Sequence, residues 1–466
     1  MSFRIAIVAL IAVMSASCVT DSPAPLLPDE PAMGASTVRA NPGNVISAIV
    51  LVRVQNADSV AVQFRVADVA ANDSTTPAVL VVGDSAVVPV LGLLPARRYS
   101  FRPIAYGPGG SATGEELELT TGDLPGDLPA FTAGGVDPTP GYVVFASGKY
   151  GIVIDNKGRV VWYLRFENGP GLNFMAQPNG RYAARPQTPD PDDIEPWIEM
   201  DALGNVTRSL GCALGLQPRP HDLISEMDGG YWLMCDDTRT MDLTVHGGRA
   251  NARVTGTNVQ HIGPDGSLKF QWSPFDHFSV SDLPASEMSG AAVNWTHGNA
   301  LEMDVDGNLL VSFRNLGEIT KVSVSSGAVM WRLGGSRNQF TFMNLSGVAF
   351  SRQHGVRVKS AGQLVLLDNT GDPNESRSEW YSIDENARTA RLMLSYGSVP
   401  RVVTQIGGSV QALAGGRTLA SFGTEGRVEE YDSSGQIMWR IEGNPGYVFR
   451  AQRIRSLYAP GMGSSR

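Results

Sequence analysis

The sequence predicts an all-β protein, and two observations carry this prediction. Short runs of β-branched and aromatic residues are separated by Gly, Asp, Asn and Ser along most of the chain, a pattern typical of antiparallel meanders. Glycine is abundant, with 52 among 466 residues, whereas charged residues make up only 18%. Many short strands joined by Gly-rich turns favour an all-β architecture over a helical one.

The first 18 residues predict an export signal. Arg4 supplies a positive start, and Ile5–Met14 form an apolar core that is too short to span a bilayer. Small residues then precede Cys18, which resembles the lipid-attachment site of bacterial lipoproteins, although Ser15 stands where Leu or Val is usual. We therefore predict a periplasmic or cell-surface protein anchored to a membrane through Cys18, with ordinary cleavage nearby as the alternative. Residues 19–36 are rich in Pro and Ala and predict a tether.

The overall charge and the cysteine content restrict the partners and the compartment. A net charge of −9 and a pI of about 5.3 argue against nucleic acid as a partner. Cys212 and Cys235 are the only cysteines after Cys18. In an oxidising compartment they could form a disulfide between neighbouring strands. The sequence leaves this pairing and two buried free thiols equally open.

Residues 37–121 predict a first domain, a small β-sandwich. Apolar and polar residues alternate over 60–66, which indicates a strand with one buried face. The spacing of Leu93, Pro95 and Tyr99 resembles the tyrosine corner of fibronectin type III domains, and the length suits such a sandwich. We expect a spacer or docking module. Residues 122–130 (GDLPGDLPA) predict a linker.

Residues 131–458 contain a weak internal repeat in which a turn is followed by an apolar run that often ends in Trp. Its copies are 157–162, 202–206, 264–272, 326–331, 384–390 and 434–439. A period of roughly 40–60 residues, with about four strands in each unit, is typical of a β-propeller. Six copies predict six blades, with seven as the alternative. We expect the run Tyr447–Ile454 to complete a blade with the start of this domain.

Three of the six histidines stand in similar settings. His221, His297 and His354 each precede the second strand predicted for their blade. Equivalent places in successive blades face the central channel, so we predict that the three imidazoles converge at one mouth of it. For any one of these histidines alone, the alternative is a purely structural role at the end of a strand.

Further polar residues accompany these histidines. Arg314 ends a strand in the blade of His297, and its planar guanidinium suits the oxygens of a tetrahedral anion. Asn299 adds an amide donor in the same blade. A salt bridge with Glu318 is the alternative reading of Arg314. Asp222 either orients His221 or is only a turn residue, and the sequence leaves both open.

These motifs resemble the bacterial arylsulfotransferase (aryl-sulfate sulfotransferase) family. The resemblance rests on Trp295-x-His297-x-Asn299, on the LVSFR strand that ends at Arg314 and on the GAVMWRLGG strand after it. Gln353-His354 and Asp368-Asn369 also match, and the similarity covers roughly residues 130–455. It implies a six-bladed propeller with its site in the central channel and transfer of a sulfuryl group between phenols without a nucleotide donor.

The resemblance also implies residue roles. His354 would be the nucleophile and carry a transient sulfohistidine, while His221, His297, Asn299 and Arg314 would bind sulfate and move protons. The implied partners are a small aryl sulfate donor and a phenolic acceptor, with no cofactor and no metal. An imidazole that attacks sulfur divides the transfer into two displacements, which predicts ping-pong kinetics.

Two departures from the family pattern concern single residues. Pro220 precedes His221 where many members have a second histidine. The aromatic residues on the acceptor side are not evident, and Tyr150 and Trp232 are the candidates.

Three other functions compete with the enzyme. The first is a non-catalytic ligand-binding propeller lipoprotein, which could retain the same basic pocket. The second is a zinc site, since three imidazoles can hold zinc, although no His-x-His or His-Glu-x-x-His spacing supports it. The third is a quinone-dependent dehydrogenase, suggested only by the Trp repeats, which packing between blades explains. Natural substrates and oligomeric state leave no pattern in the sequence.

Overall fold

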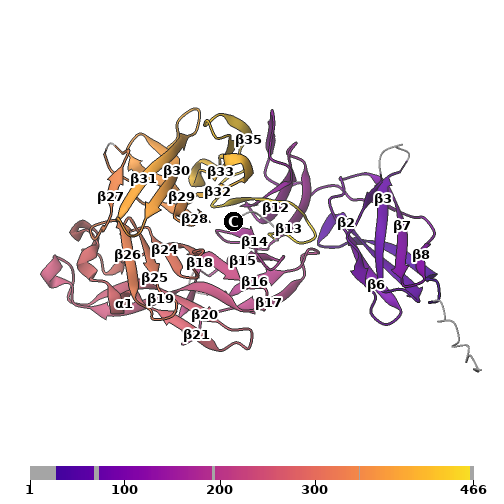
Figure 1. Cartoon of the computed structure of the whole chain (residues 1–466), viewed down its shortest axis with the longest axis horizontal. Helices are drawn as coiled ribbons and strands as arrows, with labels where there is room; N and C mark the ends of the chain where they lie inside the picture. The colour runs from indigo at the N-terminus through magenta and orange to yellow at the C-terminus, as the bar shows by residue number, and fades with distance from the viewer. Residues whose placement is uncertain (1–27, 68–72, 191–194, 346, 462–466) are drawn as a thin grey trace, which may run out of the picture.

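The computed structural model describes residues 28–67, 73–190, 195–345 and 347–461. Over these residues the regular secondary structure is almost entirely β-strand, which confirms the predicted all-β class. Two groups of sheets follow one another along the chain (Figure 1). The predicted export signal and Cys18 lie outside the described residues. Within the described ranges, none of the helices has the length and apolar character needed to cross a membrane.

The first group consists of two sheets packed face to face. Its strands are β1 (Ala32–Asn41), β2 (Asn44–Gln55), β3 (Ser59–Val66), β4 (Ser74–Thr75), β5 (Val79–Leu80), β6 (Ser85–Val90), β7 (Arg98–Gly107), β8 (Gly110–Thr113) and β9 (Leu117–Thr120). Strands β1, β2 and β6 form one sheet, and the other is centred on β3 and β7. Alternate side chains of β2, β3, β6 and β7 meet between the sheets and form one apolar core.

Two details of this sandwich relate to the sequence patterns. The hydroxyl of Tyr99 accepts a hydrogen bond of 2.9 Å from the backbone amide of Leu94, the kind of contact that the corner spacing predicts. Strand β1 begins at Ala32, inside the segment predicted to be a tether. The tether prediction is wrong for this part because Met33 packs against the sandwich core.

The second group consists of sheets arranged around a common centre (Figure 1), which confirms the propeller-like architecture. One sheet contains β11 (Tyr142–Ser147), β12 (Tyr150–Asp155), β13 (Val160–Arg165) and β36 (Ala451–Ile454), and the next contains β14 (Phe174–Ala176), β15 (Tyr182–Ala184), β16 (Trp197–Met200) and β17 (Val206–Leu210). The third sheet contains β18 (Gln217–Ser225), β19 (Tyr231–Met241), β20 (Ala252–Ile262), β21 (Leu268–Trp272) and β22 (Ala292–Asn294), and the fourth contains β23 (Gly298–Met303), β24 (Leu309–Phe313), β25 (Glu318–Val322) and β26 (Val329–Gly334). The fifth sheet contains β27 (Thr341–Met343), β28 (His354–Ser360), β29 (Gln363–Asp372), β30 (Glu375–Asp384) and β31 (Thr389–Gly397), and the sixth contains β32 (Ser409–Ala412), β33 (Thr418–Ser421), β34 (Val428–Tyr431), β35 (Ile437–Gly443) and β10 (Phe131–Gly135).

The ring is closed by strands from opposite ends of the domain. Strand β36 pairs antiparallel with β11, as the position of the last apolar run predicts. Strand β10 pairs antiparallel with β35, so a second sheet also joins early and late segments. Closure of this kind buries the faces of each sheet against its neighbours.

The repeated tryptophans explain why neighbouring sheets pack together. Trp162, Trp272, Trp331 and Trp439 occupy the fourth strand of their sheets and are all buried. The indole N–H of Trp162 donates to the carbonyl of Ala202 in the next sheet, at 2.9 Å. The repeat thus marks packing positions between blades, as a large aromatic side chain with one polar atom suits.

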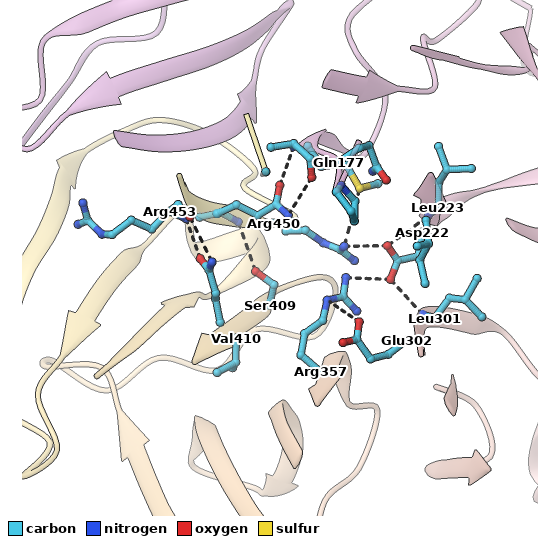
Figure 2. A pocket seen from close by; sticks show the side chains of 18 of the residues that line it. Gln177, Asp222, Leu223, Leu301, Glu302, Arg357, Ser409, Val410, Arg450 and Arg453 are labelled. Atoms are coloured by element: carbon cyan, nitrogen blue, oxygen red, sulfur yellow. Dashed lines mark hydrogen bonds and ion pairs between the residues drawn. The ribbon is translucent and has the colours of Figure 1, made fainter. Parts of the chain in front are cut away.

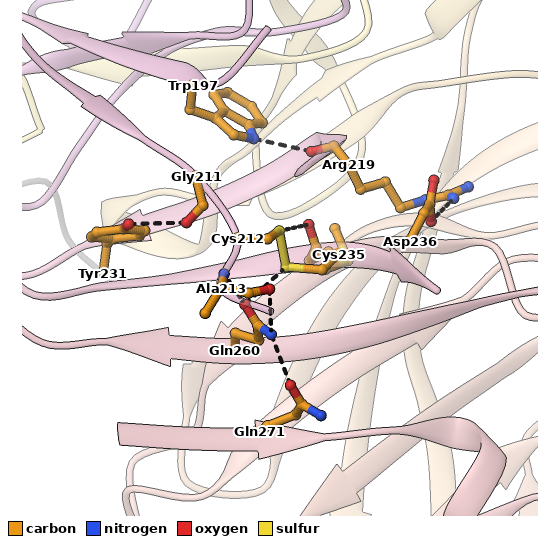
Figure 3. The surroundings of a disulfide bond; sticks show 11 residues. Trp197, Gly211, Cys212, Ala213, Arg219, Tyr231, Cys235, Asp236, Gln260 and Gln271 are labelled. Carbon is orange, nitrogen blue, oxygen red and sulfur yellow. Dashed lines mark hydrogen bonds and ion pairs between the residues drawn. A yellow bond between two sulfur atoms is a disulfide. The ribbon is translucent and has the colours of Figure 1, made fainter. Parts of the chain in front are cut away.

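A disulfide ties two neighbouring sheets together (Figure 3). Cys212, just after β17, is bonded to Cys235 of β19, with their Cα atoms 6.2 Å apart. The sequence left open whether these cysteines pair, and the structure shows that they form a disulfide. A covalent link of this kind restricts the unfolded chain and stabilises the fold.

Candidate functional site

The centre of the ring is lined by the strand at the inner edge of each sheet. These inner strands are β14, β18, β23, β28, β32 and β36. His221 lies within β18, His297 directly precedes β23, and His354 begins β28. Equivalent places in three successive sheets therefore carry the three histidines.

Two of the three imidazoles contact one aromatic ring, and the third imidazole contacts one of these two. The ring centroids of His221 and His297 are 5.0 Å apart. Phe449, which precedes the inner strand β36, lies 5.6 Å from His221 and 5.9 Å from His354 between ring centroids. The structure thus brings together the three histidines that the sequence singled out, with Phe449 between two of them.

The proton of the His354 ring is fixed by its neighbours. The amide nitrogen of Asn369 donates to the carbonyls of Thr404 and Gly407, each at 2.9 Å. The amide oxygen must then face His354 Nδ1, 2.8 Å away, and can only accept a hydrogen bond. Nδ1 therefore carries the proton and Nε2 keeps its lone pair, which faces the Gly407 amide at 3.3 Å.

For the activity that the sequence resemblance implies, replacing Asn369 with alanine is expected to slow the reaction without unfolding the protein. The change removes the acceptor that holds the Nδ1 proton, so the ring can rotate or adopt the other tautomer. We expect kcat to fall roughly 10- to 100-fold, the usual effect of removing a group that orients a reactive imidazole. Steady-state kinetics with an aryl sulfate would measure this, and unchanged kcat with normal thermal unfolding would contradict the positioning role.

All three imidazoles are held in the neutral form. Burial lowers the pKa of His354 to about 4, and the charge of Arg314 acts in the same direction. Burial, followed by the charge of Arg219, also lowers the pKa of His221 and of His297 far below its usual value. The ring atom Nδ1 of His221 is buried and has no hydrogen-bond partner among the described residues. These rings are therefore available as a nucleophile and as proton acceptors.

Arg314 is a cation without a matching carboxylate. Its Nη1 donates to Asn315 Oδ1 at 2.9 Å and its Nη2 to the carbonyl of Gln405 at 3.1 Å. Its Nε is buried without a partner, and no carboxylate of the described residues lies within ion-pair distance. The alternative reading as a partner of Glu318 is wrong, because Glu318 is paired with Arg332 at 2.7 Å. Burial lowers the pKa of Arg314, as expected for an uncompensated charge.

Asn299 has a different contact from the one expected. Its amide nitrogen donates to the carbonyl of Gln353, the residue before His354, at 2.6 Å. It therefore holds the backbone beside His354 and does not present a free donor. Its amide oxygen is buried without a partner among the described residues.

Asp222 does not touch the ring of His221 but joins several inner strands (Figure 2). Its carboxylate accepts hydrogen bonds from Arg357 at 2.9 Å, from Arg450 at 2.8 Å and from the amide of Leu301 at 3.0 Å. Burial opposes ionisation, but the two arginines outweigh it and keep the pKa of Asp222 below its ordinary value. Asp222 thus orders the channel, while Arg450 also donates to the carbonyl of His221 at 3.4 Å.

A cavity of about 270 Å³ lies in the channel on the far side of this ionic cluster (Figure 2). Asp222, Arg357 and Arg450 line it, together with Glu302 and Gln177, but none of the three histidines does. The cavity is therefore separate from the imidazoles and is not the place where they would act.

Two residues beside the histidines were missed by the sequence analysis. Phe449 is the first, and the second is Tyr447, whose hydroxyl is buried without a partner among the described residues. The Tyr447 hydroxyl lies against Gly407, the residue whose amide faces His354. Both precede β36 as the histidines accompany their inner strands, so position within the repeat could have identified them.

Two predicted aromatic candidates lie elsewhere, which corrects their assignment. The hydroxyl of Tyr150 donates to Asp127 in the linker between the domains, at 2.5 Å. Trp232 stacks on His261 with ring centroids 4.3 Å apart, and its indole donates to Glu226. Tyr150 lies on β12, the third strand from the channel, and Trp232 lies on β19, the second, so neither lines the channel. Across the part of the chain that the structure describes, no three His, Cys, Asp or Glu side chains are grouped so as to hold a metal ion.

Comparison with solved structures gives distant similarity. A protein of unknown function from Bacteroides caccae is 12% identical and aligns with a TM-score of 0.44, over 68% of this chain and all (100%) of that one. The virginiamycin B lyase of Staphylococcus aureus is 11% identical with a TM-score of 0.37, over 66% of this chain and 83% of that one. No curated protein matches the chain.

Comparison with protein families gives one specific match. Residues 219–444 match the family described as Arylsulfotransferase (ASST). This range includes His221, His297 and His354 together with Arg314 and Asn369, and it begins in β18 and ends after β35. The predicted resemblance to the arylsulfotransferase (ASST) family is thereby confirmed over residues 219–444, which include all three histidines.

Proposed function

We propose that the chain is an exported aryl-sulfate sulfotransferase that transfers a sulfuryl group from a phenolic sulfate ester to a phenol, without a nucleotide donor, through a sulfohistidine at His354. The observation that carries the proposal is the position of the proton on His354: Asn369 holds it on Nδ1, so Nε2 carries the lone pair, which accepts only a hydrogen bond of 3.3 Å from the Gly407 amide. The neutral imidazoles of His221 and His297 and the unpaired cation of Arg314 complete the site.

The first half-reaction forms the covalent intermediate. Nε2 of His354 attacks the sulfur of the donor, a bond forms between nitrogen and sulfur, and the ester S–O bond breaks. The electron pair of that bond leaves with the phenolate, which takes a proton from water. Covalent catalysis of this kind replaces one difficult displacement by two easier ones.

The second half-reaction returns His354 to its starting state. The acceptor phenol loses its proton to the neutral imidazole of His221 or His297 while its oxygen attacks sulfur. The N–S bond breaks, its electron pair returns to Nε2, and the imidazolium releases the proton to water. The depressed pKa keeps both imidazoles neutral before the transfer and makes release of the proton to water favourable, while it weakens them as bases.

The sulfuryl oxygens gather negative charge in both transition states. Arg314 is fixed by Asn315 and Gln405, and its Nε has no partner of its own. A fixed, partly dehydrated donor of this kind typically contributes about 3–4 kcal/mol to transition-state stabilisation. The guanidinium therefore needs little rearrangement to bind the sulfuryl group.

The low pKa of His354 predicts an unusual pH dependence. Only the neutral ring can attack sulfur, and the pKa of about 4 means that the ring stays neutral down to that pH. We expect kcat/KM to be level between pH 5 and pH 7, and to fall about tenfold per unit below pH 4. Stopped-flow kinetics, with near-ultraviolet circular dichroism to follow folding, would measure this. A fall centred near pH 6.5, the value for a free imidazole, would contradict it.

The direct test of the proposal is the intact mass of the protein after brief exposure to an aryl sulfate without acceptor. We expect a gain of one sulfuryl group in the native chain and no gain in His354→Ala. His246→Ala is the matched control, because His246 lies in the short helix η1 (Thr244–His246), away from the inner strands, and it should behave as the native chain does. Absence of the adduct while the donor still binds would favour a ligand-binding propeller.

The proposal that the protein is exported has separate support. The disulfide between Cys212 and Cys235 is stable in an oxidising compartment and rare in a reducing one. Metabolic labelling with a radioactive fatty acid would test the membrane anchor. We expect label in the native chain and none in Cys18→Ser, and equal labelling of the two would contradict lipid attachment at Cys18.

A further inference from the structure

Two clusters of charged residues flank His297. The first contains Arg314 and Arg352, which both donate to Asn315 Oδ1, at 2.9 Å and 3.0 Å. Arg352 is paired with Glu287 at 2.5 Å. The cluster therefore has two cations and one carboxylate. The unmatched positive charge is that of Arg314, which binds the sulfuryl group in the proposed reaction.

The second cluster contains Arg219, Asp236 and Arg185. Arg219 Nε donates to the carbonyl of Gly298, the residue after His297, at 2.7 Å, and its Nη1 is paired with Asp236 (Figure 3). Burial lowers the pKa of Arg185 and outweighs the charges of Asp236 and Glu195, which act to raise it. Its Nε is buried without a partner, and no ion pair to it exists among the described residues.

Strand pairing places Arg185 at the histidine end of the channel. Phe174 of β14 is paired with Ala184 of β15, so Arg185 follows at the same end as Asn173. The side chain of Asn173 donates to the carbonyl of His221 at 2.6 Å. Arg185 therefore lies beside the blade edge that supports His221, and not beside the cavity behind Asp222.

Asp236 and Glu195 are the carboxylates whose charges act on Arg185, but neither forms an ion pair with it among the described residues. Arg185 has no role in the sulfuryl transfer described above. Arginine is suited to carboxylate and other planar anions because its donors form a rigid fork. A partly buried guanidinium without a partner is costly unless an anion completes it.

We propose that Arg185, with Arg219, forms a second anion site that binds an acidic group on the aryl ring of the substrate. The preferred substrates are then phenols, and their sulfate esters, that carry a carboxylate or another anionic substituent. This inference rests on the proposed function, since it names the substrate class of the same site. Arg185 would contact the substrate and determine specificity, while the chemistry stays with His354 and Arg314.

The test compares two acceptors with p-nitrophenyl sulfate as donor, using the full chain. Phenol lacks the acidic group and 4-hydroxybenzoate has it. In Arg185→Gln we expect the KM for 4-hydroxybenzoate to rise roughly 10- to 100-fold, the effect of losing a charged hydrogen bond, with kcat unchanged. The kinetics with phenol should not change, which also shows that the variant is folded.

Arg181→Gln is the matched control, because Arg181 precedes β15 at its opposite end and has the same charge. It should leave the kinetics with both acceptors as they are. Equal losses with both acceptors in Arg185→Gln, or no loss with either, would overturn the proposal.

A second measurement separates this inference from the proposed function. If the native chain transfers sulfate to neither acceptor, the proposed function fails, and calorimetry with inert ligands still tests the anion site. We expect the native chain to bind 4-sulfobenzoate, a dianion, more tightly than benzenesulfonate, and Arg185→Gln to lose this difference. Equal affinity of the native chain for both ligands would overturn the second site.

Discussion

Replacing His354 with glutamine is expected to lower kcat by about four to six orders of magnitude, as removal of a covalent nucleophile does in other enzymes. Glutamine is polar and similar in size, so the ring of Phe449 and the amide of Gly407 keep a neighbour of comparable volume. It offers no nitrogen lone pair to attack sulfur. Initial rates of phenol release from an aryl sulfate would measure the loss.

A rescue experiment distinguishes loss of the nucleophile from loss of the fold. His354→Gly leaves a space beside Asn369 in which free imidazole can bind and receive the sulfuryl group. We expect added imidazole to restore part of the donor cleavage in this variant and to have no effect on His354→Gln, where the space is filled. If His354→Gln keeps more than about one hundredth of the native kcat, the nucleophile lies elsewhere.

Replacing Asp222 with alanine is expected to destabilise the propeller by about 3–5 kcal/mol. Removing one member of a buried ionic cluster leaves the remaining charges unpaired, and that cost exceeds the value of the lost contacts. Arg450, with a side chain 4% exposed, would lose its only carboxylate partner among the described residues, and Arg357 would lose the nearer of two. Unfolding in urea should therefore shift to a lower midpoint.

Tryptophan fluorescence reports this transition for the propeller alone, because all eight tryptophans follow residue 131. Asp84→Ala is the control, since Asp84 is paired with Arg53 on the exposed surface of the first domain. Surface pairs contribute about 0–1 kcal/mol, so the control should leave the transition in place. Equal midpoints for Asp222→Ala and the native chain would show that water compensates the two arginines.

The local sequence was enough to predict the fold class. Strand-length apolar runs, Gly-rich turns and the repeated tryptophans report on contacts that each sheet makes with its nearest neighbours, and such contacts recur with the repeat. The same regularity identified the pairing of β36 with β11. The start of β1 at Ala32 was not predicted, because this Pro- and Ala-rich stretch shows no clear alternation of apolar and polar residues. Only the packing of Met33 against the sandwich core makes the stretch a strand.

The repeat also predicted part of the site. His221, His297 and His354 hold similar places in successive blades, and a closed ring brings such places together. The roles of their neighbours did not follow from position. Asn299 was expected to act directly, and the structure shows that it holds the backbone beside His354. For Asp222 the sequence left open whether it orients His221 or is only a turn residue, and the structure shows that it binds arginines.

The sequence by itself therefore determined the features that recur with the internal repeat: the all-β class, the propeller and the histidines at its inner edge. Only the tertiary structure decided the proton position on His354, the disulfide, the unpaired state of Arg314 and the cluster around Asp222. Each of these depends on contacts between segments that lie far apart in the sequence; the proton position on His354, for example, also needs the carbonyls of Thr404 and Gly407, which precede β32. Their distances are set by closure of the ring, which no single stretch of sequence contains.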